Sequence, residues 1–137
     1  MAAHSLPSSL FHDLLSAFAQ DVTKKRYANL ADVLDYCRRS ANPVGRLMLL
    51  LYGASSERNN RYADGICSAL QIINFLQDIE IDYANGRIYM PQDELARFGI
   101  SESQIARGEI NDAWRAFMAF EVERTRRMLL AGAPLGQ

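Results

Sequence analysis

The amino-acid sequence predicts an all-α protein, and three observations lead to that prediction. Strand signals are nearly absent, because the chain has no alternating apolar and polar runs and no Asn-Gly turn between two such runs. Apolar residues instead recur at the three- and four-residue spacing of amphipathic helices. With 137 residues, 49% of them hydrophobic and 23% charged, the chain has the size and composition of one globular domain. We therefore expect a single helical domain over residues 1–137.

The first two helices are expected within the first 40 residues. Residues 9–20 form an amphipathic pattern whose apolar face consists of Phe11, Leu14, Leu15 and Phe18. A second helix should begin after Asn29, a residue type that caps helix N-termini, and continue toward Cys37. Because Pro43 lacks a backbone N–H and disfavours helical geometry at the preceding residue, we expect a break within residues 40–45.

The longest helical pattern covers about residues 57–83. The Asn85-Gly86 pair that follows is a typical helix stop. Pro91 can open a short helix through Phe98.

Two more helices are expected toward the C-terminus. Ser101 and Gln104 have the spacing of a capping box, in which each residue caps the other. Asn111 is the expected N-cap of a last helix over residues 112–130.

Charge and cysteine content exclude several classes of protein. Fifteen Lys and Arg against sixteen Asp and Glu give a formal net charge of -1, which provides no field to attract nucleic acid, so no nucleic-acid partner is expected. Cys37 and Cys67 have neither metal-site spacing nor a disulfide framework, which predicts reduced thiols in a cytoplasmic protein. The start of the chain does not resemble a signal peptide, and no apolar run approaches the ~20 residues of a membrane span.

The predicted long helix carries one polar stripe on an otherwise apolar segment. At ~100° per residue, positions three and four apart share a face. Steps of this size connect Gln71, Asn74, Asp78 and Asp82. Glu80 points away from Asp78. Two like charges one turn apart repel by about 0.2–0.5 kcal/mol unless a cation lies between them.

Each polar candidate has a functional and a structural interpretation, and spacing alone leaves both open. Asp78 and Asp82 suit Mg²⁺, which favours carboxylate oxygens and bridges to phosphates, but they also suit a solvated helix face. Arg87 could hold a phosphate with two hydrogen bonds, or cap the carbonyl groups of a helix end. Tyr36 could stabilise a cation or take part in proton transfer, or it could be a core tyrosine with a satisfied hydroxyl.

Two long segments carry a resemblance to a known family. "QDVTKKRYANLADVLDYCRRSANPVGRLML" contains a D-x-x-x-x-R-Y element from Asp21 to Tyr27, a Tyr-Cys pair at Tyr36 and a Val-Gly turn at Gly45. "ALQIINFLQDIEIDYANGRIYMPQDELARFGIS" contains an aspartate-rich motif followed by Gly-Arg and Pro. Together, over about residues 10–130, they resemble the squalene/phytoene synthase family. Within it, "YCRRSANPVG" and "INFLQD" are most similar to the hydroxysqualene synthases of bacterial hopanoid biosynthesis.

The resemblance implies a fold and an activity. The fold would be part of an isoprenoid-synthase-type helical bundle, with 1–137 as the central portion of a squalene/phytoene synthase domain. The activity would be the conversion of presqualene diphosphate to hydroxysqualene, or the head-to-head prenyl transfer of farnesyl diphosphate. Magnesium would assist ionisation of the diphosphate. A lipid product implies peripheral contact with the inner membrane surface.

The resemblance also implies roles for particular residues. Asp78 and Asp82 would be Mg²⁺ ligands and catalytic, and Tyr36 would lie near the reacting carbons, where an aromatic face can stabilise a cation. The expected substrate-binding residues are Gln71, Asn74 and Arg87.

The sequence departs from the family pattern in two ways. Ile81 occupies a position where the family commonly has Glu in D-x-x-E-D, which implies an altered metal site; the hydroxysqualene branch often has a less acidic motif here. The family's first aspartate-rich motif has no equivalent in the chain, so the sequence resembles a central fragment. The alternative function is therefore that of a catalytically incomplete helical fragment that acts only by self-association, as a homo-oligomer.

Overall fold

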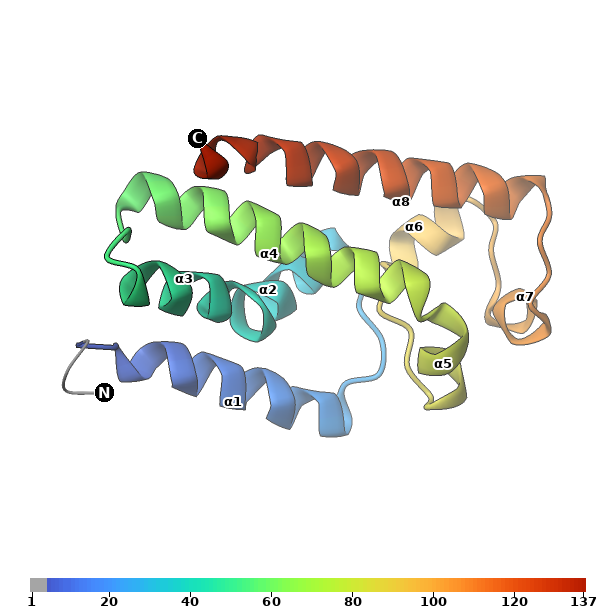
Figure 1. Ribbon diagram of the computed structural model, residues 1–137. Helices are drawn as coiled ribbons and strands as arrows, with labels where there is room; N and C mark the ends of the chain where they lie inside the picture. Colours follow the sequence, from blue (N-terminus) through green and yellow to red (C-terminus); the bar gives the residue numbers. More distant parts are fainter. Residues whose placement is uncertain (1–4) are drawn as a thin grey trace.

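The computed structural model describes residues 5–137 and confirms the all-α prediction (Figure 1). An isolated bridge between Arg26 and Ile88 is the only β-type pairing within that range. None of the helices in the described residues combines the length and apolar character that crossing a membrane requires. In chain order the elements are α1 (Ser8–Thr23), α2 (Leu30–Ser40), α3 (Asn42–Leu51), α4 (Glu57–Gln77), α5 (Ile79–Ala84), α6 (Gln92–Arg97), α7 (Glu102–Arg107), α8 (Asp112–Ala131) and the 3₁₀-helix η2 (Ala133–Gly136).

Helix α4 is the centre of the arrangement. It lies side by side with α8 along most of its length and runs antiparallel to α3 on its other side (Figure 1). Helix α1 packs on α2 and α3 and forms the opposite edge from α8 (Figure 1). Helix α5 follows α4 directly and contacts α7. Both the stripe and the elements around it are therefore positioned by α4.

Asparagine N-caps lie at the starts of α2 and α8, as predicted. The Asn29 side chain accepts a hydrogen bond from the backbone N–H of Asp32 at 2.9 Å. The Asn111 side chain accepts one from the N–H of Trp114, also at 2.9 Å. Each cap satisfies a backbone donor that the first turn of a helix otherwise leaves unpaired.

The predicted break around Pro43 is confirmed, because one residue separates α2 from α3 and Pro43 lies in the first turn of α3. The Val44-Gly45 pair, expected in a turn, lies inside α3 instead. A Cβ atom at Gly45 would be 2.6 Å from the sulfur of Cys67, so the missing side chain allows α3 to pack closely on α4. Both Cys37 and Cys67 are free thiols, as expected.

The capping box at α7 is only half formed. The Ser101 hydroxyl accepts a hydrogen bond from the N–H of Gln104 at 3.2 Å, which is the predicted cap. The Gln104 side chain does not return the bond; it donates to the Glu109 carbonyl at 3.2 Å and to Asn111 Oδ1 at 3.1 Å. Because Gln104 is buried, its amide group needs hydrogen-bond partners, and the two that it has connect α7 to the start of α8.

The prediction of one unbroken helix over residues 57–83 is wrong. At Asp78 the backbone leaves helical geometry, with φ -101° and ψ 17°, and the segment divides into α4 and α5. The hydrogen-bond pattern nevertheless continues across the break. The N–H of Asp78 donates to the Asn74 carbonyl at 2.9 Å, and the N–H of Asp82 donates to the Asp78 carbonyl at 2.8 Å. The four-residue spacing of the stripe is therefore preserved.

The apolar face predicted for the first helix is only partly covered within residues 5–137, where Phe11 and Leu14 are half-buried. Leu15 and Phe18 are 63% and 57% exposed, whereas Ala17 is the buried residue of α1. Periodicity correctly located the helix but not the direction of its contacts.

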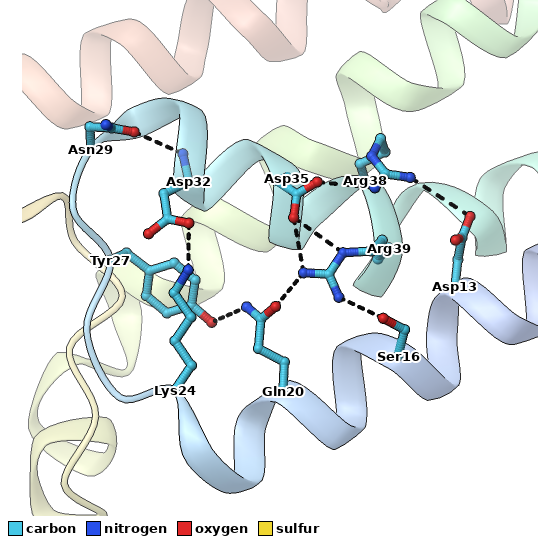
Figure 2. Close-up of polar contacts among 10 residues, drawn as sticks. All are labelled: Asp13, Ser16, Gln20, Lys24, Tyr27, Asn29, Asp32, Asp35, Arg38 and Arg39. Carbon is cyan, nitrogen blue, oxygen red and sulfur yellow. Dashed lines mark hydrogen bonds and ion pairs between the residues drawn. The ribbon is translucent and has the colours of Figure 1, made fainter.

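A polar network, not an apolar face, accounts for much of the contact between α1 and α2 (Figure 2). The buried guanidinium of Arg39 donates hydrogen bonds to Ser16 at 3.0 Å, to Asp35 at 3.0 Å and to Gln20. Gln20 in turn donates to the hydroxyl of Tyr27 at 3.2 Å. A buried charge is tolerated here because several acceptors replace its hydration.

The core consists of two apolar clusters. The first, called here the tyrosine cluster, lies between α1, α2 and α4, and its buried members are Ala17, Tyr27, Val33, Tyr36, Cys37, Ile72, Phe75 and Tyr89. The second, called here the aliphatic cluster, lies between the α5–α7 segment and α8, and its buried members are Ile88, Met90, Leu95, Ile100, Ile105 and Phe117. Leu76 packs against both clusters and joins them.

Candidate functional site

The polar stripe lies along α4 and continues into α5. Asn74 and Asp78 are exposed, and Gln71 and Asp82 are half-buried. Glu80 is exposed in a different direction, because it lines a separate hollow against α7 together with Gln77 and Gln104. This placement agrees with the prediction that Glu80 does not belong to the stripe.

The two stripe carboxylates repel each other. Burial and the nearby charge of Asp78 raise the pKa of Asp82, while Arg87 acts in the opposite direction. A cation between the carboxylates would relieve this repulsion. No group of three or more His, Cys, Asp or Glu side chains within residues 5–137 is arranged to hold a metal ion. A metal bound by the two aspartates would need further oxygen ligands from water or from a substrate, as Mg²⁺ commonly has.

Arg87 connects α5 to α1. Its backbone N–H donates to the Asp82 carbonyl at 2.8 Å, and its guanidinium donates to the Asp21 carbonyl at 3.2 Å. The guanidinium therefore binds a carbonyl group near the end of α1 and not the carbonyl groups at the end of α5, the helix that precedes Arg87. Its Nε finds no hydrogen-bond acceptor among the described residues. The positive charge of this arginine beside two carboxylates can also attract another oxygen-rich group.

Asp21, at the end of α1, is the residue that sequence analysis left without a role. Its carboxylate accepts a hydrogen bond from the Tyr36 hydroxyl at 2.6 Å and another from the Tyr89 hydroxyl at 3.0 Å. It also lies close enough to contribute to the raised pKa of Asp82. Asp21 thus joins the tyrosine cluster to the stripe. Its position in the D-x-x-x-x-R-Y element was the signal that could have identified it.

Tyr36 is buried, and its hydroxyl is satisfied by Asp21. Tyr36 is thus a core tyrosine with a satisfied hydroxyl, which was its structural interpretation. Through Asp21 it nevertheless lies close to Asp82. The Tyr36 ring lies 5.7 Å from that of Tyr89, which stacks on Phe75 with ring centroids 4.0 Å apart. Burial and the hydrogen bonds to Asp21 raise the pKa of both Tyr36 and Tyr89, so both hydroxyls remain neutral.

The structure therefore brings most of the predicted site residues to one region. Asp78, Asp82 and Arg87 are linked through backbone bonds and charge, and Tyr36 reaches them through Asp21. Gln71 and Asn74 lie further along the same face of α4 and have no side-chain hydrogen bonds to the others within the described residues. The region combines a cation-attracting pair, an arginine and neutral aromatic hydroxyls.

A family model described as squalene/phytoene synthase matches residues 1–137. The hydroxysqualene synthase of Rhodopseudomonas palustris is 38% identical over 136 residues, which is 98% of this chain and 46% of that protein. The 15-cis-phytoene synthase of Synechococcus elongatus is 33% identical over 138 residues, which is 92% of this chain and 45% of that protein.

Among solved structures, squalene synthase HpnC from Alicyclobacillus acidocaldarius superposes with a TM-score of 0.93 at 39% identity. The match covers 98% of this chain and 51% of HpnC. The fold is therefore that of the helical isoprenoid synthases, as predicted. The chain spans about half the length of each of these three proteins.

Proposed function

Because the chain belongs to the squalene/phytoene synthase family, we propose that its α1–α4–α5 region binds and ionises the diphosphate of an isoprenoid substrate. The observation that carries the proposal is the grouping of Asp78, Asp82 and Arg87 beside the tyrosine hydroxyls held by Asp21. The substrate class is an isoprenoid diphosphate, and the reaction class is head-to-head prenyl transfer or the conversion of its cyclopropylcarbinyl product.

Magnesium fits the donor set of the site. The mutual repulsion of Asp78 and Asp82 is the situation that a hard divalent cation relieves, and both side chains supply the carboxylate oxygens it prefers. When bound, the ion would supply positive charge that balances the departing diphosphate. Ile81 leaves this position of the motif without a third carboxylate, so more of the coordination must come from water and substrate oxygens.

The chain's own residues would bind and orient the substrate. The Arg87 guanidinium supplies positive charge for diphosphate oxygens, and Gln71 and Asn74 offer amide groups along the same helix face. The negative charge of Asp21 stabilises positive charge that develops in the prenyl group. Tyr36, which Asp21 holds in a fixed orientation, adds an aromatic ring to this environment.

We favour hydroxysqualene formation from presqualene diphosphate over phytoene formation. In the reaction, diphosphate leaves, and water adds its oxygen to the resulting carbocation and releases a proton. The higher identity to the hydroxysqualene synthase than to the phytoene synthase supports this choice. The chemistry requires no reductant. Since the product is a lipid, the proposed location is the cytoplasm, at the inner membrane surface.

Self-association of a catalytically incomplete helical chain is the second candidate role. The observation that favours it is the exposure of apolar side chains on α1 and on α3, including Leu15, Phe18 and Met48. Exposed apolar surface of this kind is typical of interfaces. Light scattering tests this second role, because a chain that is entirely monomeric would contradict a homo-oligomer.

The test of the first proposal is Mg²⁺-dependent turnover of presqualene and farnesyl diphosphates, with products identified by mass. It is applied to this chain alone and to a joined protein in which this chain replaces the part of HpnC that it matches. We expect hydroxysqualene from the joined protein, and a loss of about 100-fold or more in kcat with Asp78→Ala or Asp82→Ala. Glu80→Ala is the matched control, because this exposed carboxylate faces another side. Near-normal turnover by Asp78→Ala would contradict the role.

A further inference from the structure

A small interior cavity lies between the tyrosine cluster and the aliphatic cluster. Tyr89 of the first cluster and Met90 of the second both line it. The volume open to the centre of a water-sized sphere is about 10 Å³, which is room for one water molecule and too little for an organic ligand. Water is therefore the class of molecule that this cavity can bind.

The walls of the cavity are mostly apolar, and their charged side chains come from α8. Val33 of α2 and Ile72 and Phe75 of α4 are among the buried apolar residues that line it. Helix α8 contributes Glu121 and Arg124. An entirely apolar cavity stays dry, whereas a buried water needs about two to four polar partners. Whether the cavity holds water therefore depends on the polar atoms of these two α8 residues.

Each of the two α8 residues has one buried polar atom that finds no hydrogen-bond partner within residues 5–137. These atoms are Oε1 of Glu121 and Nε of Arg124. The neighbouring atoms are already paired, because Glu121 Oε2 accepts from Arg124 Nη2 at 2.7 Å, and Nη1 and Nη2 of Arg124 donate to the two carboxylate oxygens of Glu94. Glu121 is only 1% exposed, so bulk solvent does not hydrate it. Buried polar atoms normally have a partner, either in the protein or in ordered water.

We propose that one ordered water molecule occupies this cavity and links Glu121 Oε1 to Arg124 Nε. The water accepts a hydrogen bond from the Nε–H group. It donates to Oε1, or accepts from that oxygen when it carries the carboxyl proton, because water can act in both ways. The water thereby completes the hydrogen bonding of the Glu94–Arg124–Glu121 cluster, which connects α6 to α8.

Filling the cavity distinguishes a hydrated site from a dry one. Val33→Ile adds one carbon atom to a wall residue that is only 3% exposed. In a dry apolar cavity the added carbon gains contacts, which should raise Tm. In a hydrated cavity it expels the water and leaves Oε1 and Nε without a partner, so Tm should fall.

Oxygen-17 relaxation dispersion measures the water itself, because it counts water molecules held in the interior and is not affected by exchange of hydroxyl or carboxyl protons. We expect Val33→Ile to lose one such water relative to the unsubstituted chain. Val22→Ile is the matched control, since it makes the same change at a residue of α1 that is 73% exposed, and it should leave the count unchanged. A crystal structure of the unsubstituted chain should show a water oxygen about 2.7–3.2 Å from both Oε1 and Nε.

Three results would overturn the inference. An unchanged count in Val33→Ile would do so, and a raised Tm in that variant would show that the cavity is dry. The same loss of water in Val22→Ile would assign the counted water to another place, and a crystal structure without a water that contacts both atoms would contradict the site directly. Circular dichroism shows whether Val33→Ile folds, and the crystal structure decides if it does not. Turnover is not measured, so these results are independent of the test of the proposed function.

Discussion

The tyrosine cluster and the aliphatic cluster stabilise the same fold with different kinds of side chain. Buried hydroxyls occur in the first, where Tyr36 and Tyr89 both donate to Asp21 and Tyr27 accepts from Gln20. The buried members of the second carry no hydroxyl at all. Burying a hydroxyl is unfavourable unless it is hydrogen-bonded, so the first cluster needs polar partners that the second does not.

Because of this difference, the aliphatic cluster contributes only packing, whereas the tyrosine cluster also holds a polar side chain in a fixed position. In the aliphatic cluster, stability depends on how well shapes fit together. In the tyrosine cluster, the same hydrogen bonds that satisfy the hydroxyls also fix a carboxylate beside Asp82 and Arg87. The candidate site thus lies at the edge of the cluster that contains buried polar groups. Substitutions in the two clusters should therefore differ in kind as well as in size.

The largest effect is expected in the aliphatic cluster. Phe117 is fully buried on α8, and Phe117→Ala should lower the free energy of unfolding by about 3–5 kcal/mol, because a cavity replaces the ring. The measurement is urea unfolding followed by circular dichroism. Phe18→Ala is the matched control on α1, whose ring is mostly exposed, and should cost much less. Equal losses for the two variants would show that the cluster assignment is wrong.

A second effect concerns Glu121 on α8, which lines a small cavity together with Tyr89 of the tyrosine cluster and Met90 of the aliphatic cluster. Glu121 is only 1% exposed; it accepts a hydrogen bond from Arg124 at 2.7 Å, and Arg124 also binds Glu94. Burial and the adjacent Glu94 raise the pKa of Glu121 to about 8, from an ordinary value of 4.5. The hydrogen bond from Arg124 lowers the pKa of Glu94 despite its burial. The proton of the pair therefore resides on Glu121 at neutral pH.

The pH dependence of stability follows from the raised pKa of Glu121 in the folded chain. Between about pH 4.5 and pH 8 the folded chain retains a proton that the unfolded chain has lost. This contribution to stability is complete below pH 4.5. It falls by at most about 1.4 kcal/mol per pH unit between pH 4.5 and pH 8, and it is lost once the pH has risen through about 8. Glu121→Gln, which cannot ionise, should flatten the dependence of Tm on pH in this range. An unchanged slope in the variant would mean that Glu121 is ionised in the folded state.

The sequence allowed much of the fold to be predicted, because local signals determine local structure. Apolar periodicity located the helices, and Asn29, Ser101 and Asn111 each cap the helix expected of them. The break at Asp78 was not predictable from periodicity, since the stripe keeps its four-residue spacing across it. Periodicity tells which side of a helix is apolar, but not whether residues of the same chain cover it.

The candidate site was predicted less completely, for a related reason. The stripe could be found because its members lie on one segment, and simple helix geometry places them on one face. The contacts of Asp21 could not be found in this way, because it precedes Tyr36 by 15 residues and Tyr89 by 68, and only the folded chain brings the three together. Hydrogen bonds between distant segments leave no periodic pattern in a sequence. A motif can indicate that such a residue matters without indicating what it contacts.

The smallest effect should arise at Asp21, and it separates the two clusters most sharply. In Asp21→Asn the amide oxygen can accept from one tyrosine hydroxyl, but the NH₂ group cannot accept from the other. We expect a loss of about 1.5–3 kcal/mol in the free energy of unfolding, the value of one hydrogen bond to a charged group. The pKa of Tyr36 and Tyr89 should also fall toward the ordinary value, although burial will keep it raised, because the carboxylate no longer opposes ionisation. Ultraviolet titration of the tyrosines measures this shift, and Asp13→Asn on the same helix, which lies 4.0 Å from Arg38, should leave it unchanged. If Asp21→Asn left both stability and the titration unaltered, the hydroxyls would have other partners, and the tyrosine cluster would be a packing core like the aliphatic one.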